Sequence, residues 1–219
     1  MKKIVVLLGI PGSGKGTQAS FITEQFGHRH ISTGVLLRRL DADPAADPAD
    51  KAKIAAMKAG HLVDNELIYR LVFHEITQEI TAGCGVILDG AIRNLEQAEQ
   101  YQNFFETSNL VNEVQAIHLA MPDEVSVERL SHRGVCSNCN FIITHSEAGQ
   151  LETACPKCQA RIVRRPDDEP EVARERLRDQ GNAALKPLVD FYADHNVLAT
   201  IDATQDIAHV AAAITQVLS

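Results

Sequence analysis

The sequence lacks the long apolar run that a membrane helix requires. The apolar run near its N-terminus, residues 4–10, is far shorter than the roughly 20 residues that span a bilayer. It leads into PGSGKG without a small-residue cleavage site, so we expect neither a signal peptide nor a membrane partner. Basic residues are not in excess either, because 29 Asp and Glu outnumber 21 Lys and Arg and give a formal charge of −8. This balance argues against a nucleic-acid partner.

Cysteine is scarce, and four of the five cysteines form two C-x-x-C pairs. Cys136 and Cys139 are separated by fifteen residues from Cys155 and Cys158, a spacing typical of a closed tetrahedral Zn²⁺ site. We expect a cytoplasmic protein, where thiols stay reduced and such pairs are more often metal sites than disulfides. Another metal, an iron centre and disulfides are the alternatives. Cys84 stands alone and is expected to be a small core or loop residue.

Short β-branched runs alternate with helical patterns along the 219 residues, which predicts an α/β fold with a parallel sheet of about five strands. The candidate strands are residues 3–8, 29–32, 86–89, 114–119 and 197–201. Two segments interrupt this alternation. Residues 33–82 are helical by pattern around the loop DADPAADPAD, and residues 134–165 hold the paired cysteines. Both are predicted to be insertions into one core.

The strongest motif is GIPGSGKGT, which follows the first predicted strand and opens a helix. Its glycines permit a tight turn that points backbone N–H groups at a phosphate chain, and the helix N-terminus adds partial positive charge. Lys15 is expected to reach the β- and γ-phosphates. The residue after Lys15 is Gly16, and Thr17 follows one position later than in the general P-loop pattern. The motif predicts a core of the P-loop NTPase type.

GIPGSGKGTQ resembles the phosphate loop of adenylate kinases, and further motifs follow in that family's order. They are HISTGVLLR, GHLV, ILDGAIRNLEQA, ERLSHR, RRPDDEPEVARERL and IDATQDIAHV. The resemblance covers essentially the whole chain. It implies a core of residues 1–32, 83–133 and 166–219, a nucleoside monophosphate-binding insertion of residues 33–82, and a zinc-ribbon-like lid of residues 134–165. Because a lid of about 30 residues cannot build a core of its own, a metal would replace one.

The resemblance also implies a reaction, the reversible conversion of Mg²⁺·ATP and AMP into two ADP by a monomer. The charge of such a transition state lies on phosphoryl oxygens, so cations matter more than bases. By position in the motifs, the catalytic cations would be Lys15, Arg93, Arg129, Arg133, Arg165 and Arg176. ATP would contact Gly12, Ser13, Gly14, Lys15, Gly16, Thr17, Arg129, Arg133, Ile142, Ile143 and Gln205. AMP would contact Thr33, Arg38, His61, Leu62, Val63, Gly90, Ala91, Ile92, Arg93, Gln97, Arg165 and Arg176.

Several departures from the family pattern keep other interpretations open. Asn94 stands where pyrimidine-directed relatives often have Asn, so CMP or UMP is an alternative acceptor. Val35 replaces a carboxylate that helps to hold Mg²⁺, which leaves Asp89 to orient the ion and makes a weakened, nucleotide-binding pseudoenzyme conceivable. Ala91-Ile92 replaces the family's Phe-Pro, whose peptide is cis. A cis peptide before a residue other than proline costs roughly 2.5–4 kcal/mol, so we predict a trans peptide here.

Asp167 and Asp168 precede a predicted helix, and their carboxylates would suit its first turn. The resemblance adds an ion pair between this acidic segment and an arginine of the lid. The two roles are compatible.

Overall fold

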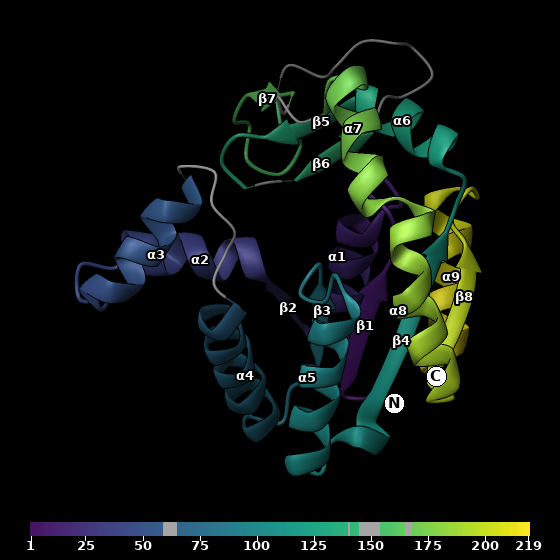
Figure 1. Cartoon of the computed structure of the whole chain (residues 1–219). Helices are drawn as coiled ribbons and strands as arrows, with labels where there is room; N and C mark the ends of the chain where they lie inside the picture. Colours follow the sequence, from purple (N-terminus) through teal and green to yellow (C-terminus); the bar gives the residue numbers. More distant parts are fainter. Residues whose placement is uncertain (59–64, 140, 145–153, 165–167) are drawn as a thin grey trace. The chain divides into compact units, whose positions relative to one another are not determined.

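The computed structural model describes the chain except for residues 59–64, 140, 145–153 and 165–167 (Figure 1). The described chain forms two compact units. The first consists of Met1–Leu7, Ala19–Ala116 and Leu218, and the second of Leu8–Gln18, Ile117–Val217 and Ser219. The domain boundaries expected from the sequence stay predictions.

A parallel sheet of five strands forms the core, in the order β2-β3-β1-β4-β8. Its strands are β1 (Ile4–Leu8), β2 (Arg29–Ser32), β3 (Val86–Asp89), β4 (Val114–Ala120) and β8 (Leu198–Asp202). Each predicted strand is present within one residue of its expected bounds. All five residues of β1 are buried, as expected for a strand covered on both faces, whereas β2 and β8 lie at the sheet edges and are partly exposed.

The first unit carries the helices of the predicted insertion and the helix that follows β3. These elements are α2 (Thr33–Ala42), α3 (Pro48–Lys58), α4 (Asn65–Thr81), α5 (Leu95–Thr107) and the short 3₁₀ helix η1 (Val111–Glu113). The loop with the repeated Asp-Pro dipeptides ends α2 and opens α3, as predicted. Leu37, Ile54 and Leu67 form a small apolar core that joins α2, α3 and α4.

Aromatic side chains join α4 to α5, which lie side by side in Figure 1. The Phe73 and Phe104 rings stack with their centroids 4.2 Å apart, and Tyr101 packs edge-on against Phe73 at 4.9 Å. Tyr101 and Phe105 are fully buried. Such pairs stabilise packing by about 0.5–1.5 kcal/mol beyond the area they bury. These contacts join the middle of α4 to the C-terminal half of α5.

The second unit contains the predicted lid and the C-terminal helices. Its elements beyond the core sheet are α6 (Asp123–Ser131), β5 (Arg133–Cys136), β6 (Ile142–Thr144), β7 (Ile162–Val163), α7 (Pro170–Gln180), α8 (Asn182–Asp194) and α9 (Ile207–Leu218). Strand β5 pairs antiparallel with both β6 and β7, so the lid segment holds a small sheet of its own. Helix α1 (Lys15–Phe26) begins in this unit and ends in the first. None of the described helices is long and apolar enough to cross a membrane.

Candidate active site and metal centre

The loop between β1 and α1 has the backbone that the glycine motif predicts. Gly9 and Gly12 have φ angles of 152° and 80°. A Cβ atom on Gly9 would lie 2.5 Å from Ser13 Oγ, and one on Gly12 would lie 3.1 Å from the Ser126 carbonyl oxygen. A larger residue would therefore be strained at both positions. The loop leads directly into α1, whose N-terminal N–H groups and dipole favour an anion.

Lys15 is the first residue of α1, and its ammonium group turns back over the loop. Lys15 Nζ donates to the carbonyl oxygens of Gly9 at 2.6 Å and Ile10 at 3.1 Å. The fully buried Ser126 of α6 fixes the other side of the loop, because its hydroxyl donates to the Pro11 carbonyl oxygen. Sequence reasoning missed Ser126. The available signal was its place on α6, one helical turn before Arg129.

Two of the predicted arginines meet on one buried carboxylate. Arg133, at the start of β5, donates from Nε at 2.8 Å and from Nη2 at 2.5 Å to the two oxygens of Asp168. Arg176 of α7 places Nη1 3.8 Å from the same carboxylate. The Asp168 side chain is only 3% exposed. The predicted ion pair between the acidic segment and an arginine at the lid is therefore present.

The predicted helix cap by Asp168 is not formed. Glu169 occupies the N-cap position of α7, and it makes no side-chain capping hydrogen bond. The Asp168 carboxylate is engaged by the two arginines instead, which give a buried carboxylate more stabilisation than a backbone N–H would.

Arg129 of α6 lies beside the segment that follows β8. Its Nη2 donates to the Thr204 carbonyl oxygen at 3.2 Å, next to Gln205. The pKa of Asp202 is lowered, chiefly because the Thr204 hydroxyl donates to its carboxylate at 2.6 Å, and the Gln205 amide adds a second hydrogen bond at 3.1 Å. Arg129 and Gln205, two predicted ATP contacts, are thus brought together at the end of β8.

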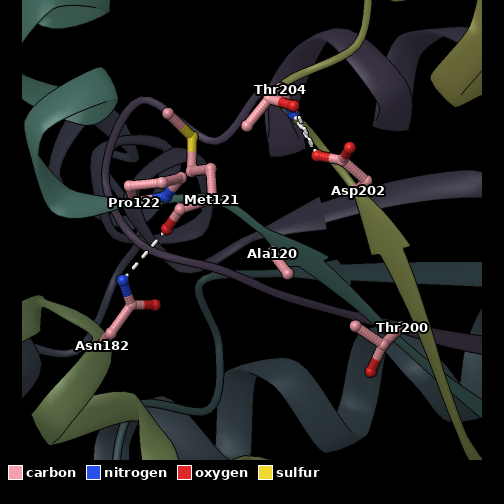
Figure 2. A pocket seen from close by; sticks show the side chains of 7 residues that line it. All are labelled: Ala120, Met121, Pro122, Asn182, Thr200, Asp202 and Thr204. Atoms are coloured by element: carbon pink, nitrogen blue, oxygen red, sulfur yellow. Dashed lines mark hydrogen bonds between the residues drawn. The ribbon is translucent and has the colours of Figure 1, made fainter.

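An open hollow of about 600 Å³ adjoins this segment (Figure 2). It is lined by Ala120, Met121, Pro122, Asn182, Thr200, Asp202 and Thr204. Figure 2 shows the Asn182 side chain directed at Met121, whose carbonyl oxygen accepts from Asn182 Nδ2 at 3.0 Å. The hollow therefore lies between the end of β4, the edge strand β8 and the start of α8.

The four paired cysteines converge in the lid. Their sulfur atoms all lie within 4.8 Å of one another, and three of the separations are 3.4, 3.5 and 3.6 Å. A tetrahedron with Zn–S distances of about 2.3 Å has edges of about 3.8 Å, whereas a disulfide requires about 2.05 Å. All four cysteines are free thiols. The donor set fits a tetrahedral metal ion and does not fit two disulfides.

A hydrogen bond within the Cys136–Cys139 pair lowers the pKa of the Cys136 thiol. The Cys139 backbone N–H donates to Cys136 Sγ at 3.4 Å, and this is the main reason that the pKa of the Cys136 thiol falls to about 6. Metal ligation requires the thiolate. Cys136, Cys155 and Ile162 form a small buried cluster against which Ile143 packs. Beyond the sulfurs, the described part of the lid therefore has little apolar core.

The predicted acceptor residues Arg93 and Gln97 are linked in the first unit. The Arg93 backbone N–H donates to Gln97 Oε1 at 2.8 Å, and Gln97 Nε2 donates to Asn65 Oδ1 at 3.1 Å. Asn94 caps α5 by accepting from the Gln97 backbone N–H at 2.8 Å. Sequence reasoning did not include Asn65. No periodicity or motif pairs the first residue of α4 with α5, so this contact required the structure.

The remaining acceptor residues of the first unit surround the end of β3. The Ala91–Ile92 peptide is trans, as predicted, and both side chains are buried. Arg93 Nε donates to the Gly90 carbonyl oxygen at 3.0 Å, so the guanidinium folds back over the loop. Thr33 is buried, and its hydroxyl has no hydrogen-bond partner among the described residues. Arg38 lies one turn further along α2, next to Gly34.

Asp89, the predicted magnesium residue, ends β3 between two neighbouring strands. It pairs in register with Leu7 of β1 and Ser32 of β2. His30 Nε2 lies 3.2 Å from Asp89 Oδ2, and the Asp89 side chain is 18% exposed. A partly exposed carboxylate fits a hydrated Mg²⁺ ion. Sequence reasoning missed His30, although its position two residues before Ser32 on the adjacent strand was a usable signal.

Some predicted site residues lie outside the described part of the chain. They are Arg165, His61, Leu62 and Val63, together with Asp167. Ile142 and Ile143 form part of β6 in the lid.

Comparison with known proteins gives matches over nearly the whole chain. The family model described as "Adenylate kinase" matches residues 7–197. The adenylate kinase of Nitrosococcus oceani is 38% identical over 216 residues, which cover 97% of each chain. That of Thermodesulfovibrio yellowstonii is 33% identical over 215 residues, 98% of each chain. That of Archaeoglobus fulgidus is 35% identical over 207 residues, 94% of this chain and 93% of its relative.

Proposed function

Because the chain belongs to the adenylate kinase family and is therefore a kinase, we propose that it transfers the γ-phosphate of ATP to AMP and forms two ADP. The observation that carries this proposal is the phosphate loop, in which Lys15 opens α1 behind glycines at positions where a larger residue would be strained. The loop and the N-terminus of α1 supply N–H groups and positive charge for ATP phosphates. Lys15 exchanges its carbonyl contacts for the β- and γ-phosphates.

The arginines stabilise the charge that develops during transfer. Arg129, Arg133 and Arg176 belong to the second unit with the phosphate loop, and Arg93 and Arg38 belong to the first. Guanidinium groups bind phosphoryl oxygens through two parallel hydrogen bonds, and in a site that excludes water this stabilisation is large. Closure of the lid brings Arg133 to the phosphates and excludes water. Arg165 takes part in the same closure.

Two metal ions accompany this mechanism. Asp89, which His30 contacts at 3.2 Å, would hold a Mg²⁺ ion that accompanies ATP, and the ion would supply positive charge to the phosphates. Cys136, Cys139, Cys155 and Cys158 would hold a Zn²⁺ ion with a structural role, since all four ligands would come from the protein.

AMP is favoured as the acceptor by Thr33 and Gln97. The Thr33 hydroxyl, which has no hydrogen-bond partner in the described part of the chain, and the Gln97 carboxamide supply polar groups for a base in the first unit. Asn94, which had pointed to a pyrimidine acceptor, has a structural task that is independent of the base, because its side chain caps α5. A Thr at this position caps a helix in the same way.

A coupled assay of ADP formation tests this proposal. With ATP and Mg²⁺, the rate with AMP is expected to exceed the rates with CMP, UMP and GMP at least tenfold in kcat/KM. A higher rate with CMP or UMP would reassign the acceptor, and no rate above background with any of the four would indicate a nucleotide-binding pseudoenzyme. Light scattering in solution is expected to give the mass of a monomer.

A further inference from the structure

The carboxamide of Gln97 has a fixed orientation in the ligand-free protein. The Arg93 backbone N–H can only donate, so the atom that it contacts at 2.8 Å is the carboxamide oxygen Oε1. Nε2 consequently faces Asn65, and Asn65 must present its oxygen to accept this hydrogen bond at 3.1 Å. Gln97 is only 7% exposed. If the Gln97 carboxamide were reversed, its oxygen would face the Asn65 oxygen and its NH₂ group would face the Arg93 N–H.

This orientation restricts what Gln97 can offer to a base. A carboxamide has two N–H donors and two lone pairs on its oxygen, and Arg93 and Asn65 use one of each. Among the described residues, nothing else occupies the acceptor position and the donor position that remain, and their order is fixed. Adenine and cytosine present an exocyclic N–H donor beside a ring nitrogen acceptor on their Watson–Crick edges. Uracil and guanine present a carbonyl acceptor beside a ring N–H donor, which is the opposite order.

We propose that Asn65 is a specificity-determining residue that acts by positioning Gln97. The Arg93 backbone N–H sets the orientation of the carboxamide, and Asn65 holds Nε2 in place, so that the acceptor site favours bases with an exocyclic amino group and disfavours bases with a carbonyl in its place. The wrong base would leave buried polar groups unpaired, which is the strongest form of discrimination available to a hydrogen-bonding site. This inference rests on the proposed function, since it assumes that Gln97 contacts the acceptor base.

Two further contacts support the hydrogen bond between Asn65 and Gln97. The Asn94 side chain fixes the Gln97 backbone through the N-cap of α5. The stacked rings of Phe73 and Phe104 join α4 to α5. Asn65 therefore approaches Gln97 from a helix that packs on α5.

The test compares Asn65→Leu, which removes the acceptor oxygen, with Asn65→Asp, which keeps it. Asn65→Leu is expected to lower the ratio of kcat/KM for AMP to kcat/KM for UMP at least tenfold. Asn65→Asp is expected to keep this ratio within about threefold of wild type, on the scale of other substituted hydrogen-bonding sites. Asn103→Leu, a matched change at an exposed position of α5, is expected to leave the ratio unchanged. A merely structural role of Asn65 would lower both kcat/KM values together.

A second measurement does not depend on turnover. NMR of the ligand-free wild-type protein is expected to show a slowly exchanging Gln97 side-chain N–H, and Asn65→Leu is expected to accelerate its exchange. A wild-type ratio that favours AMP but is unchanged in Asn65→Leu would overturn the inference, as would rapid exchange of the Gln97 amide in wild type. If wild type does not prefer AMP while the amide is protected, the proposed function fails and the fixed carboxamide stands.

Discussion

At the scale of single residues, Lys15 tests the proposed function most directly. Lys15→Met is expected to lower kcat/KM about 100- to 1000-fold, because under the proposed function it removes a cation from the phosphoryl site. Lys186→Met is the matched control, since Lys186 forms an exposed pair with Asp190 on α8 and is expected to have no effect. Steady-state kinetics with ATP and AMP measure both. A loss of less than threefold in Lys15→Met would contradict the assigned role.

A second residue tests stability instead of catalysis. The Tyr192 hydroxyl is buried without a hydrogen-bond partner among the described residues, and burial raises its pKa. Tyr192→Phe is expected to stabilise the protein by about 1 kcal/mol at pH 8, because an unpaired buried hydroxyl is unfavourable. Urea denaturation with an unchanged m-value measures this effect. A destabilised variant would show that the hydroxyl has a partner.

The raised pKa of Tyr192 also makes the stability of the protein depend on pH. The folded state holds the phenol proton more tightly than the unfolded state. The stability that the protein has with a protonated Tyr192 is therefore fully present below the unfolded pKa of about 10. It is lost as the pH rises through the folded pKa. Wild type is therefore expected to lose more stability than Tyr192→Phe between pH 8 and pH 10.5. Equal losses of stability in the two proteins would show that a group other than Tyr192 titrates in this range.

At the scale of elements, Asp168 joins β5 of the lid to α7. Asp168→Asn would leave Arg133 partly buried without its bidentate partner, and breaking such a pair costs about 3 kcal/mol. The matched control is Asp190→Asn, whose exposed pair with Lys186 contributes less than about 0.5 kcal/mol. Urea denaturation compares the two. Equal effects would show that Asp168 contributes no more than a surface carboxylate.

The lid provides the second prediction at this scale. Protein purified without chelator is expected to contain about one zinc per chain by mass spectrometry, because the sulfur separations match a tetrahedral site. Cys136→Ser is expected to lower the melting temperature more than it lowers the rate at low temperature, and Cys84→Ser is expected to keep the metal. Freshly prepared wild-type protein without zinc would refute this account of the lid.

The elements themselves were largely predictable, and particular residues show why. The β1 residues form an apolar run because both faces of the strand are covered, and burial of that kind leaves a direct trace in the sequence. The Asp-Pro dipeptides marked the break between α2 and α3. By contrast, Glu169 takes the N-cap of α7 because Asp168 is drawn to Arg133, and this competition depends on a tertiary contact.

At the scale of the whole molecule, the motifs pointed to candidate site residues but not to their hydrogen bonds. Lys15 and the glycines were predictable because a phosphate loop is a local structure. The contacts between Asn65 and Gln97, between His30 and Asp89, and between Ser126 and Pro11 each join residues from different elements. The net charge of −8 is compatible with anionic substrates because arginines are gathered locally. Two of them, Arg133 and Arg176, meet on Asp168.

The fate of the γ-phosphate tests the central claim most directly. The protein is incubated with Mg²⁺, AMP and ATP that carries ³²P in the γ position, and the products are separated by thin-layer chromatography. Transfer to AMP predicts that the label appears in ADP, at a rate that depends on AMP and is lost in Lys15→Met. Label that stays in ATP, or that appears only as inorganic phosphate, would contradict the proposal that this protein phosphorylates AMP.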